Sequence, residues 1–465
     1  MSDPASWTLV EAADAVAAKK ISALELTQAA IARAKAWQPK INAFIALGEE
    51  VALDAAKRAD ASPVKGKLHG VPLAHKDMYY RKGRVASCGS AIRRDWQAET
   101  TATAVVRLDD AGAIDLGTLN MAEFAFGPTG HNYHYGHCRN PWNTAHMTGG
   151  SSSGSGASVA ARIVYGALGS DTGGSIRMPS FCNGLVGIKP TWGRVSKAGA
   201  MPLSWSMDTV GPLTRSVADA ARILGIIAGA DPEDTTASAV PVEDYEAACG
   251  KPVAGMRLGL PQGYFDQNID GQVAASIEAA AKIFEKLGVK LVPVKMPDLD
   301  AINAAGTMIT GAEAASAHRA WLADMPEKYS EQVRARLSTG LAIPAVAYLD
   351  ALRNRAAAIP GFVADVFGQC DALLCPVSDR PVPTIAETDV GGGPAMGPLL
   401  AALTRLCRPF NVLGLPSLSV PCGFDKAGLP LGFQLAGRPF AEATLFALGA
   451  AYERETPWSR MAPKA

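Results

Sequence analysis

The sequence predicts an α/β fold, in which a mixed central β-sheet is covered by α-helices on both faces. From residue 66 onward, short apolar runs such as 70–74, 113–117 and 163–169 alternate with glycine-rich turns. Small-residue segments of helical character, such as 157–162, lie between these runs. Apolar runs separated in this way are typical of buried strands with helices between them.

Two helices are predicted at the start of the chain, before the first strand. Residues 8–11 and 22–25 both have the S/T-x-x-E form of a capping box, and each precedes a stretch rich in alanine. In the second stretch Leu24 and Ile31 recur with helical spacing, and we expect that helix to end before Pro39. We expect the pair to pack on the outside of a larger body.

Later segments supply further helices and strands. The helix candidates are 217–229, 273–287 and 345–367, and the strand-like runs are 256–260, 289–294, 372–375 and 418–421. The sequence contains no internal repeat and no linker long enough to mark a domain boundary. We therefore expect one domain over residues 1–465.

Composition narrows the range of partners. The 465 residues include 44 Lys and Arg and 44 Asp and Glu, so nothing electrostatic draws the whole molecule to nucleic acid or an anionic membrane. Residues 1–7 lack the features of a signal peptide, and no run approaches the roughly 20 apolar residues of a membrane span. We expect a cytoplasmic protein with a small-molecule substrate, without a nucleic-acid or membrane partner, and we leave a homodimer open.

The cysteines give no sign of a metal or redox site. All eight are scattered, and none forms a C-x-x-C pair, which argues against a zinc knuckle and a thioredoxin-type site. Buried free thiols are the expected role.

Two segments rich in glycine and serine, 149–156 and 169–177, are the most unusual part of the sequence. Composition alone fits a flexible linker. A linker has no reason to lie between two candidate core strands, however, and glycine at this density costs backbone entropy. We therefore interpret both segments as parts of a functional site.

A tight turn over 172–175 is predicted to aim backbone N–H groups at one point beside the Ser175 hydroxyl. The donors would be the N–H groups of Thr172, Gly173, Gly174 and Ser175. Such convergent donors form an oxyanion hole, and each is typically worth about 2.7–4 kcal/mol of activation barrier. The two glycines would let a substrate carbonyl approach closely. Ser175 is therefore the candidate nucleophile.

The candidate base is Lys76, because a serine hydroxyl needs a base to take its proton. None of the seven histidines sits in an arrangement that the sequence identifies as a Ser-His-Asp triad, and lysine is the base in Ser-Lys enzymes. If the run from residue 70 is a buried strand, alternation sends Lys76 and Asp77 to opposite faces. Burial would then lower the lysine pKa from about 10.4 towards neutrality. A solvated surface charge is the alternative.

These motifs resemble the amidase signature family. The matching segments, in the order and spacing of the family, are 149–152, 169–177, 187–194 and 208–219, with further likeness at 70–77, 120–124, 414–421 and 428–434. The resemblance implies a single amidase domain over 1–465, a catalytic core at 66–220 and a variable, substrate-shaping region at 295–400.

The resemblance also implies a Ser-cisSer-Lys triad. Ser175 would be the nucleophile, Lys76 the terminal base, and Ser151 a bridging serine beside a cis peptide bond that relays the proton between them. Neither a metal nor an organic cofactor is expected.

Three further residues would support the triad. Ser152 would contribute hydrogen bonds, and Asp171 and Arg177 would fix the loop of the nucleophile. The chain departs from the family pattern where Ser153 and Gly154 stand in place of two glycines. We expect altered local packing there and unchanged chemistry.

Four other motifs have weaker interpretations. Asp171 to Gly173 reads as the D-T-G of an aspartic protease, but no second D-T-G exists to share a proton. The histidines of 131–137 lack an accompanying carboxylate pattern for a metal, so we interpret them as a loop near the substrate. Residues 62–65 have the S-x-x-K form without its companion motifs, and 154–156 lacks the remaining features of a nucleotide-binding loop.

The sequence therefore predicts an amidase that hydrolyses a small-molecule amide through an acyl-enzyme on Ser175. The alternative is the glutaminase (A) subunit of a tRNA-dependent amidotransferase, which resembles the chain through the same motifs. A non-catalytic binding protein would be expected to lack one triad residue, and all three are present.

Aryl, short aliphatic and indole-acetamide-like substrates all stay open, as does ester cleavage. Within 295–400, Met308, Trp321 and Met396 are candidates for lining the acyl pocket, although core packing is the commoner role of such residues.

Overall fold

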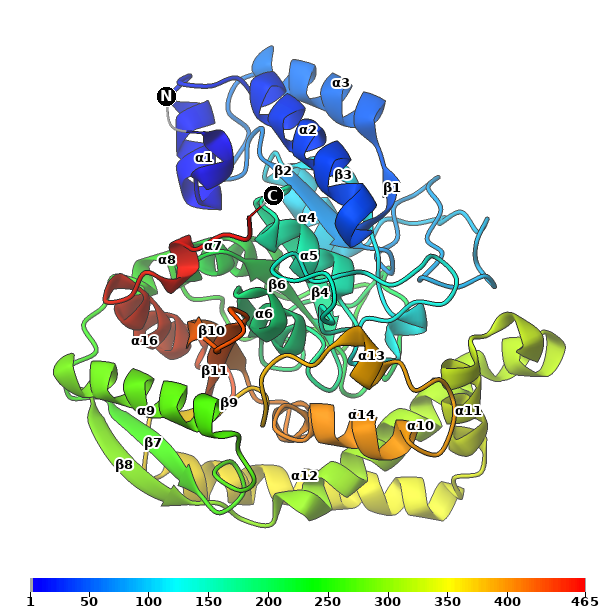
Figure 1. Cartoon of the computed structure of the whole chain (residues 1–465), viewed down its shortest axis with the longest axis vertical. Coiled ribbons are helices and arrows are strands. Elements are labelled where there is room, and N and C mark those ends of the chain that lie inside the picture. Colours follow the sequence, from blue (N-terminus) through cyan, green and yellow to red (C-terminus); the bar gives the residue numbers. More distant parts are fainter. Residues whose placement is uncertain (1–2, 465) are drawn as a thin grey trace.

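The computed structural model describes residues 3–464, and its centre is one mixed sheet of 11 strands (Figure 1). The strands are β1 Phe44–Leu47, β2 Pro72–Lys76, β3 Ile114–Leu119, β4 Gly166–Asp171, β5 Val186–Lys189, β6 Thr209–Thr214, β7 Arg257–Gln262, β8 Lys290–Lys295, β9 Ala372–Pro376, β10 Ser417–Phe424 and β11 Pro430–Gly437. Their order in the sheet is β1-β3-β2-β4-β6-β5-β10-β11-β9-β7-β8. Parallel pairs such as β2 with β4 occur beside antiparallel pairs such as β4 with β6, which confirms the predicted mixed sheet.

Helices cover this sheet and confirm the predicted α/β fold. They are α1 Leu9–Ala17, α2 Ala23–Ile41, α3 Glu49–Asp60, α4 Thr103–Asp110, α5 Ser153–Ala160, α6 Arg177–Asn183, α7 Val217–Ile227, α8 Tyr245–Ala248, α9 Gly271–Lys286, α10 Leu299–Asp324, α11 Glu331–Leu341, α12 Ala345–Phe367, α13 Ile385–Thr388, α14 Met396–Thr404, α15 Arg408–Val412 and α16 Glu442–Arg454. Short 3₁₀ helices are η1 Pro4–Ser6, η2 Glu123–Ala125, η3 Pro326–Lys328 and η4 Trp458–Arg460. Helices α5 and α6 pack together and contact the sheet, and α7 and α16 do the same. Within residues 3–464, no helix has both the length and the apolar character needed to cross a membrane.

The first two helices begin at the predicted capping boxes, but the predicted end of the second is wrong. Helix α2 includes Pro39 and continues to Ile41. A proline so near the end removes only one backbone donor, and the buried side chains of Trp37 and Ile41 hold the last turn in place. The next residue, Asn42, caps the helix in a left-handed conformation with φ of 50°, as asparagine tolerates.

The segment 149–156 is core rather than linker, because it is buried throughout and its second half forms the start of α5. Its glycines allow close approach of the backbone. A Cβ atom on Gly154 would lie 2.3 Å from the carbonyl oxygen of Ala43, and one on Gly156 would lie 2.6 Å from the side chain of Asn183. Small residues are therefore required by packing at these positions.

The topology brings distant residues to one edge of the sheet. Strands β2 and β4 are parallel neighbours, so their carboxyl ends, at Lys76 and Asp171, lie at the same edge. The loop before α5 reaches this edge, since Lys76 bonds to Ser151. Helices α10, α11, α12 and α14, from the segment predicted to be variable, are grouped at one end of the molecule (Figure 1).

Candidate active site

Lys76 occupies a fully buried position at the end of β2. Its amine donates to Ser151 Oγ at 2.7 Å and to Ser170 Oγ at 2.8 Å. The peptide bond between Gly150 and Ser151 is cis. The structure thus brings together the predicted base and the predicted bridging serine, although 75 residues separate them in the chain.

Burial lowers the pKa of Lys76 to about 7, although the negative charges of Asp208 and Asp171 act in the opposite direction. The neighbouring Asp77 does not hold the lysine charged. Its carboxylate accepts from the Ser87 hydroxyl and, at 3.1 Å, from the Gly89 N–H. A sizeable fraction of the amine is therefore uncharged near neutral pH, as a base requires.

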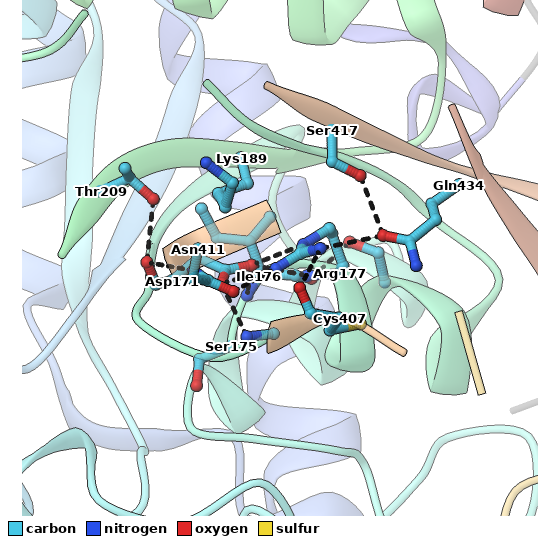
Figure 2. Close-up of polar contacts among 12 residues, drawn as sticks. Asp171, Ser175, Ile176, Arg177, Lys189, Thr209, Cys407, Asn411, Ser417 and Gln434 are labelled. Atoms are coloured by element: carbon cyan, nitrogen blue, oxygen red, sulfur yellow. Dashed lines mark hydrogen bonds and ion pairs between the residues drawn. The ribbon is translucent and has the colours of Figure 1, made fainter. Parts of the chain in front are cut away.

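Ser175 is partly exposed, and its hydroxyl points away from the buried residues around it (Figure 2). Among residues 3–464, no hydrogen bond joins this hydroxyl to Ser151, so the second link of the predicted triad is open in this structure. Ser152 connects the two segments instead, because its hydroxyl donates to the Ser175 carbonyl at 2.6 Å. Ser152 also accepts from the N–H of Ser170 at 3.3 Å.

The loop 172–175 has a different set of free donors from the one the sequence predicts. The N–H of Gly174 donates to Asp171 Oδ1 at 2.7 Å, so this group is already occupied. The N–H groups of Thr172, Gly173 and Ser175 have no partner within the described part of the chain. Without substrate, the buried Asp171 carboxylate therefore competes for the Gly174 N–H, and the role of all four N–H groups as oxyanion donors stays a prediction.

A buried ion pair holds the loop from behind (Figure 2). Asp171 accepts from Arg177 Nε and Nη2, both at 3.1 Å, and from Asn411 Nδ2 at 2.7 Å. Burial alone would raise the pKa of Asp171, but the charge and hydrogen bonds of Arg177 hold it below its ordinary value. Arg177 also donates to the Cys407 carbonyl and to Gln434 Oε1, both at 2.9 Å. These contacts fix both ends of the nucleophile loop.

Replacing Arg177 with methionine should lower the free energy of unfolding by about 3–5 kcal/mol, because it leaves the Asp171 carboxylate buried without its counter-ion. Urea unfolding of both proteins measures the change. The control is Arg353→Met, since Arg353 pairs with Asp350 on the surface with 82% of its side chain exposed. That change should stay within about 1 kcal/mol. Equal midpoints for the two variants would contradict this role of Arg177.

Ser153 fits where the family pattern has glycine. It is the first residue of α5, and its hydroxyl donates to the carbonyl of Asn120 at 3.3 Å. This contact leaves the Lys76–Ser151 bond intact, so local packing absorbs the substitution.

Several residues that shape the site were not assigned a role from the sequence. Ser170 provides the second hydroxyl on Lys76. Asp208 accepts from the Thr172 hydroxyl at 2.5 Å, and Asn411 reaches Asp171 across 240 positions of the chain. The motif 169–177 includes Ser170, but only the fold shows that its side chain turns towards the lysine.

The rings of His131 and His137 stack with their centroids 4.5 Å apart, but the three histidines of 131–137 bond to different partners. His131 bonds to Thr388 Oγ1 at 3.0 Å, His134 to Glu123 Oε1 at 2.9 Å and His137 to Asp389. No group of three metal-binding side chains is present between residues 3 and 464.

A cavity of about 880 Å³ opens beside the nucleophile. Thr172, Gly173 and Ser175 line one side, and Met308 and Met396 lie among the residues of α10, α11 and α14 that line the other. Trp321 is not part of the lining and stacks on Phe124 instead. The cavity thus combines a partly exposed serine, unpaired N–H donors and a largely apolar wall.

Comparison with known proteins assigns the chain to a class. A family model described as Amidase matches residues 25–446. The chain therefore belongs to the amidase family, which confirms the resemblance in its motifs, and it is an enzyme that cleaves amide C–N bonds.

The similar proteins include amidotransferase subunits and a peptide amidase. The glutamyl-tRNA(Gln) amidotransferase (A) subunit of Geobacter sp. (strain M21) is 37% identical over 97% of each chain. The structure of the protein of that name from Thermotoga maritima has a TM-score of 0.85 and 32% identity, covering 100% of this chain and 99% of that one. The peptide amidase PAM, solved with the competitive inhibitor chymostatin, has a TM-score of 0.87 and 31% identity, covering 98% and 99%.

Proposed function

We propose that the chain hydrolyses the C–N bond of a small-molecule carboxamide through an acyl-enzyme on Ser175. The observation that carries this proposal is a buried lysine of lowered pKa, 2.7 Å from Ser151, at a cavity that Ser175 lines. The same geometry supports the assignment of Lys76 as base and Ser151 as bridge.

In the first step, Ser175 Oγ forms a bond to the amide carbon. Its proton passes to Ser151, whose own proton passes to Lys76, and the carbonyl oxygen becomes an oxyanion. The free N–H groups of Thr172, Gly173 and Ser175 are the proposed donors to that oxyanion. The C–N bond then breaks, and the proton on Lys76 returns through Ser151 to the leaving nitrogen.

Water completes the reaction along the same route. It attacks the ester carbon, gives its proton through Ser151 to Lys76, and releases the carboxylate as Ser175 regains its proton. The open contact between Ser151 and Ser175 is compatible with this scheme, since catalytic hydrogen bonds are often long before substrate binds.

A second candidate is the glutaminase component of a tRNA-dependent amidotransferase. Sequence relatives favour it over the first candidate, because the Geobacter protein, 37% identical, carries the name of such a component. The structural likeness does not separate the two, since the peptide amidase and the Thermotoga protein are about equally similar.

Assays of the purified chain without partners distinguish the two candidates. Release of ammonia from amides other than glutamine, by the chain alone, is the expected result for a small-molecule amidase. If the chain hydrolysed no amide other than glutamine, and hydrolysed glutamine only after amidotransferase partner proteins were added, the small-molecule amidase would be contradicted. The cytoplasmic location and the independence of cofactors stay predictions, and the question whether the chain forms a homodimer stays open.

A further inference from the structure

Two arginines line the cavity beside Ser175. Arg336 comes from α11, and Arg408 is the first residue of α15. Within residues 3–464 neither guanidinium forms an ion pair with a carboxylate, whereas the buried Arg177 is paired with Asp171. Both residues are half-buried, so each guanidinium is partly removed from water without a carboxylate beside it.

Arg336 is held by neutral groups. Its Nη1 donates to the Phe126 carbonyl at 2.8 Å, and its guanidinium lies 3.4 Å from the centre of the Phe126 ring. Burial and the charge of Arg408 lower the pKa of Arg336 to about 9, which leaves it protonated at neutral pH. The contacts fix the side chain and leave its charge uncompensated.

Arg408 lies beside the loop of the nucleophile. It donates to the hydroxyl of Thr307 at 2.8 Å and to that of Thr404 at 2.5 Å. A Cβ atom on Gly173 would lie 3.8 Å from Arg408 Nε, so the guanidinium is close to the proposed oxyanion donors. A substrate group bound by Arg408 would therefore be separated from the reacting carbonyl by only a few bonds of the substrate.

The rest of the cavity wall, as formed by residues 3–464, offers no negative charge. Its polar side chains are hydroxyls such as Thr307, Thr310 and Thr339, and no Asp or Glu of the described chain belongs to the lining. Glu331 lies next to Gly392, which lines the cavity, but Glu331 itself does not line it. Two cations without acidic neighbours attract an anion and repel an ammonium group.

We propose that the substrate is the monoamide of a short dicarboxylic acid, and that Arg336 and Arg408 bind its free carboxylate. Guanidinium groups match carboxylates in geometry and charge. Because the described wall lacks a carboxylate for an α-ammonium group, glutamine fits worse than the same amide without the amino group. This inference rests on the proposed acyl-enzyme at Ser175 and narrows the class of acyl group.

The first test compares matched amides on the wild-type chain. Succinamate, glutaramate and adipamate are each compared with the neutral amide in which methyl replaces carboxylate. For at least one length, kcat/KM should be about 10- to 100-fold higher for the anion, the range expected for hydrogen bonds to a charged group. Glutaramate should also exceed glutamine, which differs only by its amino group. Preference for the neutral amides at all three lengths, or for glutamine, would overturn the proposal.

The second test changes the arginines. In Arg408→Met and Arg336→Met, the ratio of kcat/KM for the preferred anion to that for its neutral partner should fall about tenfold or more. Arg408→Lys should restore part of the ratio, because it restores the charge. The control Arg353→Met, on the surface, should keep the wild-type ratio. An unchanged ratio in both cavity variants would overturn the assignment.

Binding to Ser175→Ala separates this inference from the proposed chemistry. Calorimetry should detect glutaramate binding that is lost when Arg408→Met is added. Arginine-dependent binding together with an inactive wild type would leave the carboxylate site standing and refute the hydrolysis. Hydrolysis of neutral amides together with absent glutaramate binding would refute the carboxylate site and leave the proposed hydrolysis standing.

Discussion

Replacing Ser175 with alanine should reduce amide hydrolysis by about 10⁶-fold, as loss of a serine nucleophile does in comparable enzymes. The Ser175 hydroxyl is the only group of the protein proposed to bond to the substrate carbon. The cavity should persist, because the Ser175 carbonyl keeps its hydrogen bond from Ser152. Steady-state ammonia release measures the loss, and circular dichroism shows that the variant is folded.

The matched control for this variant is Ser153→Ala. Ser153 is buried near Ser151, but its hydroxyl donates to the carbonyl of Asn120, outside the proton path. The activity of Ser153→Ala should stay close to that of the wild type. If Ser175→Ala retained substantial activity in a folded protein, another residue would have to be the nucleophile.

Replacing Lys76 with alanine should reduce turnover by about 10²- to 10⁴-fold, the usual contribution of a general base. Lys76→Arg should be as inactive, because arginine keeps the charge but does not release its proton. The pair of variants thus separates a base from a structural cation. Initial rates at several pH values, on protein shown to be folded, measure the effect.

Lys189 offers a control of the same residue type. It is equally buried, and burial together with the charge of Arg177 lowers its pKa to about 7. Its amine, however, donates to the Pro190 carbonyl rather than to a serine. Lys189→Met should therefore retain far more activity than Lys76→Ala. Equal losses in both would mean that a buried lysine matters here for stability rather than for proton transfer.

Local signals in the sequence predicted much of the fold. Apolar runs located the strands that carry the site, since the run from residue 70 overlaps β2, and the run 163–169 overlaps β4, which begins three residues later and ends two residues later. Capping boxes located α1 and α2 because their hydrogen bonds span only three residues. The position of Lys76 at the end of a buried strand followed from the same local reasoning.

Features that depend on distant residues could not be predicted. The N–H of Gly174 donates to Asp171, which is itself fixed by Asn411 from the far end of the chain. The two cavity arginines likewise meet only through the packing of α11 and α15. Neither the apolar periodicity nor a motif reports such contacts, because both describe neighbours along the chain.

The most direct test of the central claim is the pH dependence of acylation at Ser175. A chromogenic ester with a stable acyl group would be used, with the labelled residue identified by peptide mass spectrometry. Because the base works only when uncharged, the rate should rise about tenfold per pH unit below 7 and level off above the Lys76 pKa of about 7. Acylation at another residue, or a rate at Ser175 that does not change across this range, would contradict the proposed role of Lys76.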